Sequence, residues 1–208
     1  LFPVGERNPL GHTSGATWQV ECGEPVAITD AHGIHVAFNQ YDAMCRPTTT
    51  SFAGGSWIQR GYVGLGNPAG QYVETTTPAA DGSSTPVWSR TYLDGLGRTY
   101  RATRKGVPTD VASDSEYDAR GRLTRTSLPY SVGTSPRWAS ASYDAFDRTI
   151  RLTYPDGAFT QSIHGFSGGK PYVQAVDERG VSTFEYFDIY GRKSHHYEYG
   201  NGQWIAST

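Results

Sequence analysis

The sequence is short of charge, of helical periodicity and of long apolar runs. Charged residues make up only 18% of the 208 residues, and the formal net charge is −2 at pH 7. No basic surface therefore predicts binding to nucleic acid. No stretch approaches the roughly 18 consecutive apolar residues of a membrane span, and no signal peptide is recognisable. No window repeats apolar residues with the period of an amphipathic helix, which argues against an α-rich fold.

Cysteine is also scarce. Cys22 and Cys45 are the two cysteines of the chain, too few for the disulfide framework of a small secreted domain. Pairing between them stays open at this point, but we expect two unpaired thiols. A cysteine nucleophile would also need a histidine base and an activating environment, and no motif supplies one.

Turn-forming and aromatic residues are abundant instead. The chain has 25 Gly and 12 Pro, together 37 of 208 residues, and 14 Tyr and 5 Trp. Between the turn signals, apolar and polar residues alternate, with Ile34, Val36 and Phe38 on one face of a predicted strand. This alternation predicts antiparallel strands with one packed face and one wet face. Residues 54–90 are less regular, and we expect a loop-rich excursion there.

One six-residue pattern occurs five times. It consists of an apolar or aromatic residue, Asp, two variable residues, a turn residue and Arg, and its copies occupy residues 41–46, 93–98, 117–122, 143–148 and 187–192. A shorter form without the Arg occupies residues 8–11, 30–33 and 177–180, and Tyr-Pro-Asp-Gly occupies residues 154–157. Turn signals at intervals of roughly 8–12 residues predict an all-β chain of antiparallel hairpins.

We interpret the shared residues as turn formers. An Asp that opens a turn accepts hydrogen bonds from the backbone N–H groups ahead of it, and a Gly three residues later adopts a positive φ, often next to a bulge. Cys45 and Asp147 replace that Gly; Asp tolerates the left-handed region better than Cys, so we expect a distorted or different turn at Cys45. We also expect each Tyr to stack on the Arg of its own hairpin. The turn residues assigned in this way are Tyr41, Asp42, Arg46, Asp94, Gly97, Arg98, Tyr117, Asp118, Gly121, Arg122, Tyr143, Asp144, Arg148, Asp188, Gly191 and Arg192.

No catalytic, cofactor or metal site is predicted. The motif carboxylates are evenly spread, whereas acid–base catalysis needs a defined pair. His195 and His196 are adjacent and point to opposite faces of a strand, so they cannot chelate together. There is no nucleophile elbow or phosphate-binding glycine loop. The candidate binding feature is a set of aromatic residues, which we interpret first as packing layers and second as a sugar- or peptide-stacking surface: Trp57, Tyr62, Tyr72, Trp88, Tyr92 and Tyr100.

The Tyr-Asp-x-x-Gly-Arg pattern resembles the YD repeat of the RHS family. Residues 94–98, Asp-Gly-Leu-Gly-Arg, and residues 127–130, Ser-Leu-Pro-Tyr, are similar to the RHS section of the B/C components of bacterial Tc toxins and their SpvB-like and Rhs relatives. The likeness extends from Asn8 to Trp204. It implies an arc of a spiral β-shell that encloses a variable C-terminal toxic domain. The self-cleaving Asp-Pro-x-Gly core of the bacterial shells is absent from this sequence.

The resemblance implies a scaffolding role. Residues 1–208 are expected to form a single RHS/YD-repeat region, a fragment of a much longer chain, which encapsulates and presents a toxic cargo. The implied partners are other RHS repeats or subunits of the same toxin complex and the enclosed toxic domain, and the implied location is extracellular after export. A cell-surface adhesion or carbohydrate-binding module is the alternative, and a glycoside-active enzyme is a third.

Overall fold

A computed structural model of the chain describes residues 2–80, 82–200 and 203–207 and contains no helix within them. It divides into two compact units, Leu1–Ala112 and Ser113–Thr208. Because every regular element among the described residues is a β-strand, the predicted all-β fold is confirmed. Among these residues, no helix has the length and apolar character that a membrane crossing requires.

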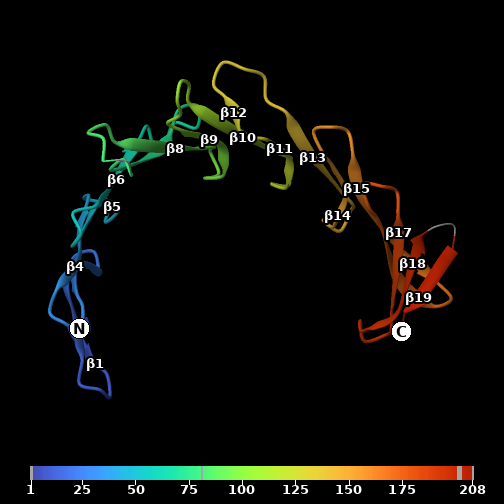
Figure 1. Cartoon of the computed structure of the whole chain (residues 1–208), viewed down its shortest axis with the longest axis horizontal. Helices are drawn as coiled ribbons and strands as arrows, with labels where there is room; N and C mark the ends of the chain where they lie inside the picture. Colours follow the sequence, from blue (N-terminus) through green and yellow to red (C-terminus); the bar gives the residue numbers. More distant parts are fainter. Residues whose placement is uncertain (1, 81, 201–202, 208) are drawn as a thin grey trace. The chain divides into compact units, whose positions relative to one another are not determined.

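The first unit is an antiparallel meander in which each strand pairs with the next along the chain (Figure 1). Its strands are β1 (Gly5–Arg7), β2 (Thr13–Gln19), β3 (Glu24–Thr29), β4 (His35–Tyr41), β5 (Pro47–Phe52), β6 (Trp57–Val63), β7 (Tyr72–Thr77), β8 (Val87–Leu93) and β9 (Thr99–Arg104).

The second unit continues the same pattern, with one short extra strand. Its first strand, β10 (Val111–Tyr117), begins just before the boundary of the unit at Ser113. The strands that follow are β11 (Leu123–Ser127), β12 (Tyr130–Ser131), β13 (Trp138–Tyr143), β14 (Thr149–Thr153), β15 (Phe159–Ser167), β16 (Lys170–Val176), β17 (Ser182–Phe187), β18 (Lys193–Gly200) and β19 (Gln203–Ser207). β10 pairs with β11, β11 with β13, and each later strand with its successor. The Asn201-Gly202 turn expected between β18 and β19 lies outside the described residues.

The structure of residues 54–90 differs from the loop-rich excursion expected there. It contains β6, β7 and the start of β8, joined by longer connections over residues 64–71 and 78–86. Gly64, Gly66, Pro68, Gly70, Pro78 and Pro86 fall in these connections. The Thr-rich stretch Tyr72–Thr77 is a regular strand because β-branched residues suit the pleated backbone. The excursion is therefore confined to two hairpin loops.

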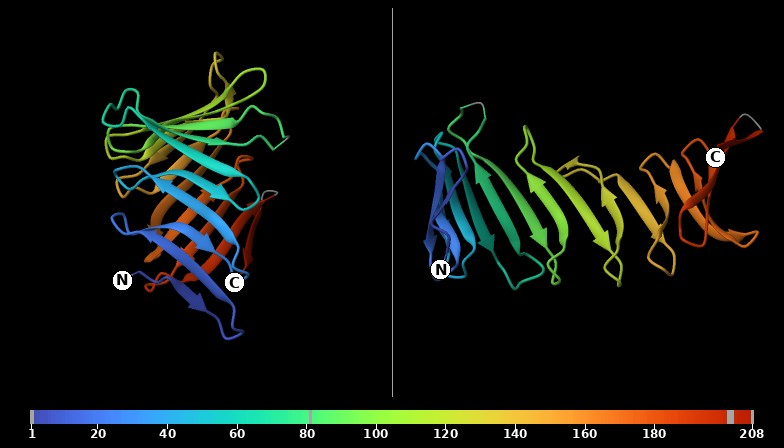
Figure 2. Two further views of the ribbon diagram at one scale, coloured as in Figure 1. Left: turned by 90° about the vertical axis from the view of Figure 1, so that its left-hand side faces the viewer. Right: turned by 90° about the horizontal axis from the view of Figure 1, so that it is seen from below.

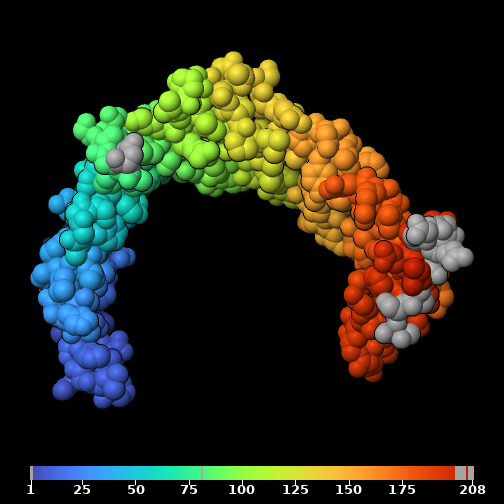
Figure 3. Space-filling view, in the orientation of Figure 1, coloured from blue at the N-terminus to red at the C-terminus, as the bar shows by residue number. Residues whose placement is uncertain are grey.

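Neither unit has a packed core in the ordinary sense. The buried hydrophobic residues among those described are Ala27, Ala37 and Ala112, and no large side chain is fully buried. The expected packed face is missing, since Ile34 is 55% and Phe38 46% exposed. Within each unit the described strands form one layer (Figures 1 and 3). The strands must therefore be held together by ladder hydrogen bonds, ion pairs and ring contacts between neighbours.

Because neighbouring strands are antiparallel, the connections of each unit alternate between two edges (Figure 2). The full Asp–Arg motifs lie at the connections β4–β5 and β8–β9 in the first unit and at β10–β11, β13–β14 and β17–β18 in the second. All of these belong to one edge of their unit, which we call the motif edge. The shorter forms lie at β1–β2, β3–β4, β14–β15 and β16–β17, on the opposite edge.

Candidate functional site: the repeated Asp–Arg turn

The five Asp–Arg turns share one hydrogen-bond pattern. In the turn that opens with Asp118, the Oδ1 atom accepts from the backbone N–H groups of Arg120 (2.9 Å) and Arg122 (3.0 Å). Its Oδ2 atom accepts from the Nε and terminal nitrogens of Arg122, both at 2.7 Å. The backbone N–H of Gly121 closes the turn by donating to the Asp118 carbonyl at 2.9 Å. Asp42, Asp94, Asp144 and Asp188 make the equivalent backbone and Arg contacts.

These contacts hold the pKa of each motif carboxyl below its usual value. For Asp118 the main cause is the hydrogen bond from the Arg122 backbone N–H, with the Arg122 side chain adding to it. For Asp42 the Arg46 side chain is the main cause. At Asp144 burial acts in the opposite direction, but the hydrogen bonds from Arg148 and Phe146 outweigh it and the pKa is still lowered. The carboxylates are therefore ionised and fully engaged, which suits a structural role better than proton transfer.

The fourth turn position has a positive φ in every copy. Gly97, Gly121 and Gly191 have φ values of 77°, 85° and 76°, as expected for glycine. Cys45 (φ 59°) and Asp147 (φ 64°) are the non-glycine residues with positive φ among those described. The Cys45 turn has the same closing hydrogen bonds as the others, so the expected distortion there is wrong.

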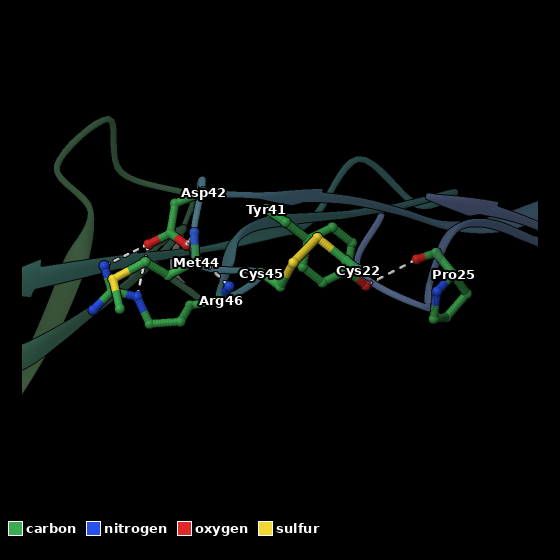
Figure 4. Close-up of a disulfide and its surroundings, with 7 residues drawn as sticks. All are labelled: Cys22, Pro25, Tyr41, Asp42, Met44, Cys45 and Arg46. Carbon is green, nitrogen blue, oxygen red and sulfur yellow. Dashed lines mark hydrogen bonds and ion pairs between the residues drawn. A yellow bond between two sulfur atoms is a disulfide. The ribbon is translucent and has the colours of Figure 1, made fainter. Parts of the chain in front are cut away.

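Both replacements connect one turn to its neighbour on the same motif edge. Cys45 forms a disulfide with Cys22 in the β2–β3 connection (Figure 4). Asp147 binds Arg122 at 2.7 Å and Arg120 at 2.9 Å, both in the preceding motif turn. The expectation of two unpaired thiols is therefore wrong; antiparallel pairing brings Cys22 and Cys45 together with 5.3 Å between their Cα atoms, although 23 positions separate them in sequence. At each of these two positions, a side chain that links two hairpins replaces a glycine, which would adopt the positive φ more easily.

A β-bulge follows every motif turn. Tyr117 pairs with Leu123, but Glu116 pairs with Arg125, so Thr124 is the extra residue. The Thr124 hydroxyl donates to the Glu116 carbonyl at 3.1 Å. Thr48 and Ser194 occupy the same place in their hairpins and make the same contact. The short hydroxyl side chain thus anchors the bulge.

The tyrosine contacts differ from the expected stacking within one hairpin. The Arg122 guanidinium lies 4.8 Å from the ring centroid of Tyr143, which belongs to the next repeat. The Tyr143 hydroxyl donates to the carbonyl of Leu123, the residue after that Arg, at 2.7 Å. Arg46 and Tyr62 repeat this arrangement, with Tyr62 donating to the carbonyl that follows Arg46. A tyrosine therefore connects a motif Arg to the following strand.

Three of the six aromatic candidates contact one another. In the first unit, Tyr92 has ring centroids 5.1 Å from Tyr72 and 6.1 Å from Tyr100. Arg90 lies over the rings of Tyr72 and Trp88 while it pairs with a carboxylate of the neighbouring strand. These half-buried rings form cross-strand packing layers, the first of the two interpretations. Trp57 begins β6, opposite Ser51.

Other contacts were not visible in the sequence. Gln71 is 9% exposed; its side-chain N–H donates to the Asp94 carbonyl (2.7 Å) and its oxygen accepts from Gly66 N–H (2.9 Å). It thereby connects the long 64–71 connection to a motif turn. Tyr172 lies over Gly165 on the facing strand and joins a ring cluster with Phe184 and Tyr186. No spacing rule distinguishes such partners from other polar or aromatic residues.

The histidines do not converge on a ligand. The His195 ring stacks on Tyr197, whereas His196 Nδ1 lies 3.6 Å from a Glu185 oxygen. In the part of the chain that the structure describes, no group of three or more His, Cys, Asp or Glu side chains could hold a metal ion.

A family model described as a domain of unknown function (DUF6443) matches residues 68–178, which is 111 of the 208 residues. The chain belongs to this family. No curated protein matches the sequence of this DUF6443 chain.

Solved structures resemble the DUF6443 chain over 98% of its length. The crystal structure of TcdB2-TccC3 matches with a TM-score of 0.76 at 15% identity. The same complex without the hypervariable C-terminal region matches with a TM-score of 0.76 at 12% identity. The chain covers 14% and 16% of those chains. The likeness confirms the predicted resemblance to the Tc toxin RHS shell at the level of the fold.

Proposed function

We propose that the chain is a structural shell segment of an RHS-repeat bacterial toxin, which encapsulates and presents a toxic C-terminal cargo. The observation that supports this most is the fold likeness to TcdB2-TccC3 over 98% of the chain. The chain spans about one seventh of the matched structure's length, so the cargo and the remaining shell would come from further polypeptide. Its partners would be other RHS repeats or subunits of the complex and the enclosed toxic domain, and the assembly would act outside the producing cell.

The turn geometry supports a role without catalysis. Both carboxylate oxygens of Asp118 are occupied, one by two backbone N–H groups and the other by Arg122. A general base needs a free oxygen within reach of a substrate proton, and the repeated motif offers none. The sixteen motif residues assigned from the sequence would instead form the turns that keep hairpins in register.

The test uses the full-length protein that carries this segment. We expect its C-terminal region to resist protease when the segment is intact. The double variant Asp118→Ala/Arg122→Ala breaks one motif turn and should expose that region to cleavage, whereas Glu178→Ala/Arg179→Ala, at an exposed turn of the opposite edge, should not. Equal protection in both variants would contradict a shell role.

A cell-surface adhesion or carbohydrate-binding module is the second candidate, which the aromatic layers favour. Tyr72, Tyr92 and Tyr100 gather on neighbouring strands, and tyrosine rings offer apolar faces to sugars. Binding of the isolated chain to a glycan array, lost in Tyr92→Ala, would support this candidate over the shell.

A further inference from the structure

The first unit carries a covalent link between two neighbouring turns, the disulfide between Cys22 and Cys45 (Figure 4). Both turns are closed by backbone hydrogen bonds of their own. The Gly23 N–H donates to the Gln19 carbonyl at 2.9 Å, and the Cys45 N–H donates to the Asp42 carbonyl at 3.0 Å. The disulfide therefore adds a connection between two turns that are complete without it.

Non-covalent contacts also hold the two cysteines near each other. The strands β3 and β4, which lie between them in the sequence, are paired, and the side chains of Asn39 and Tyr41 both donate to the Pro25 carbonyl at 2.9 Å. Figure 4 shows the Tyr41 contact beside the disulfide. In the reduced chain these contacts would keep the two thiols close, so that closing the bond is an intramolecular step at a high effective concentration. Because the sequence has two cysteines, no other pairing within the chain competes.

The bond is accessible to small thiols. Cys22 and Cys45 are both half-buried, and their neighbours Glu21, Glu24 and Met44 are exposed. Cys45 also keeps a φ of 59°, a backbone conformation that costs energy in a residue other than glycine. Exposed or strained disulfides are the labile ones among protein disulfides. A small thiol can therefore open this bond while the hairpins around it stay paired.

We propose that Cys22 and Cys45 form a reversible redox lock of the first unit, open in a reducing compartment and closed in an oxidising one. The co-reactant is a small thiol of the glutathione class. Its thiolate attacks one sulfur of the disulfide and releases the other as a cysteine thiolate, and a second glutathione then displaces the mixed disulfide. Two glutathione molecules are thereby oxidised to one glutathione disulfide, while the two cysteines are reduced and each gains a proton. Closure runs the same steps in reverse.

The lock changes how firmly two hairpins are joined. When it is closed, the β2–β3 connection is bonded to the β4–β5 turn; when it is open, this lateral connection is lost and the strand ladder remains. The corresponding connection in the second unit, between Asp147 and Arg122, is an ion pair and does not react with thiols. Redox conditions therefore act on the first unit and leave the second as an internal control.

The inference rests on the proposed function at one point, the passage from a reducing cytosol to an oxidising exterior. The lock would be open before export and closed after it. The thiol chemistry itself requires neither a shell nor a cargo. Because the protease-protection test changes a motif turn of the second unit, a failure of the shell role and a failure of the redox lock can be told apart.

The experiment is a redox titration of the full 208-residue chain in mixtures of reduced and oxidised glutathione at neutral pH. Free thiols are trapped with N-ethylmaleimide and counted by mass spectrometry, and circular dichroism follows the fold. We expect excess reduced glutathione to open the bond without loss of the strand signal. The equilibrium constant for closure should be at least about tenfold higher in the folded chain than in urea, because the folded chain holds the thiols together. A disulfide that resists glutathione until urea is added would overturn the proposal, as would loss of the fold on reduction.

Limited proteolysis measures the conformational effect of the lock. Glu21 is exposed next to Cys22, and Glu178 is exposed in the β16–β17 connection of the second unit. A glutamate-specific protease should cleave after Glu21 at least about tenfold faster in the reduced chain, because local opening becomes easier, and after Glu178 at the same rate in both states. The variant Cys22→Ser/Cys45→Gly, which cannot form the bond but accepts the positive φ, should be cleaved rapidly after Glu21 in either buffer. Cleavage of the wild-type chain after Glu21 at one rate in both redox states would overturn the proposal.

Discussion

Asp147 occupies a position where the other motif turns have glycine or cysteine, and its carboxylate binds Arg122 of the preceding turn at 2.7 Å. It keeps a φ of 64° to do so. In the first unit, Cys45 adopts the same backbone conformation and connects to a neighbouring turn through its disulfide. One position of the repeat therefore serves as a lateral connection wherever glycine is replaced.

Substitutions at Asp147 should separate backbone strain from the ion pairs. Asp147→Gly and Asp147→Ala both remove the contacts to Arg120 and Arg122, but only Gly relaxes at positive φ. We expect the free energy of unfolding of the Ala variant, measured with urea, to be about 1 kcal/mol lower than that of the Gly variant. Arg120→Ala, which removes one exposed pair, should cost less than about 1 kcal/mol. Equal stability of the Gly and Ala variants would show that φ at this position carries no cost.

Gly121→Val should destabilise the chain much more than Ala119→Val. Gly121 has a φ of 85°, which a β-branched residue resists, whereas Ala119 is exposed in the same turn. The expected costs are about 1–3 kcal/mol and under about 1 kcal/mol in the free energy of unfolding. Similar costs at the two positions would mean that the turn relaxes to another geometry.

Removing the disulfide should weaken the first unit. The bond joins residues 23 apart in sequence, and loop-closure entropy predicts a loss of about 3 kcal/mol. The variant Cys22→Ser/Cys45→Gly should lose less stability than Cys22→Ser/Cys45→Ser, because glycine suits the positive φ of residue 45. Hydrogen exchange can follow strands β2–β5 under native conditions, with β15–β18 of the second unit as the internal control. Unchanged exchange in β2–β5 on reduction would contradict the prediction.

The lowered pKa values of the motif carboxyl groups predict a loss of folding stability in acid. Their pKa values in the folded chain lie below the unfolded value of about 3.9, as at Asp42, Asp94, Asp118, Asp144 and Asp188. The stabilisation is therefore complete above the unfolded pKa and is lost as the pH falls through the folded values. Urea midpoints measured from pH 7 to pH 3 should fall steeply at the acid end. Asp118→Asn should be less stable at pH 7 and less sensitive to acid, and a pH profile identical to that of the wild type would contradict this.

The sequence predicted the repeated element better than the contacts between copies. The Asp-to-Arg spacing and the glycine at position four are local, because the turn closes within five residues, and Asp118 and Gly121 behave as expected. The partner of Cys45 depends on which turns lie on the same edge, which follows from strand pairing over the whole hairpin series. The same applies to Tyr143, whose ring meets an Arg of the preceding repeat, and to Gln71, whose partner Asp94 is 23 residues away.

The missing packed face has a related cause. Alternation along residues 34–38 predicted one buried side. The pattern of a single strand does not show whether a second layer exists to cover that side. Phe38 is 46% exposed since no other described layer of its unit covers it.

Electron cryomicroscopy of the full-length protein that contains this chain is the decisive test of the shell role. A shell role predicts that residues 1–208 form part of the wall of a β-shell, with density for the C-terminal region inside it. A map in which these residues form a separate module, exposed on both faces and outside any enclosure, would contradict the shell role.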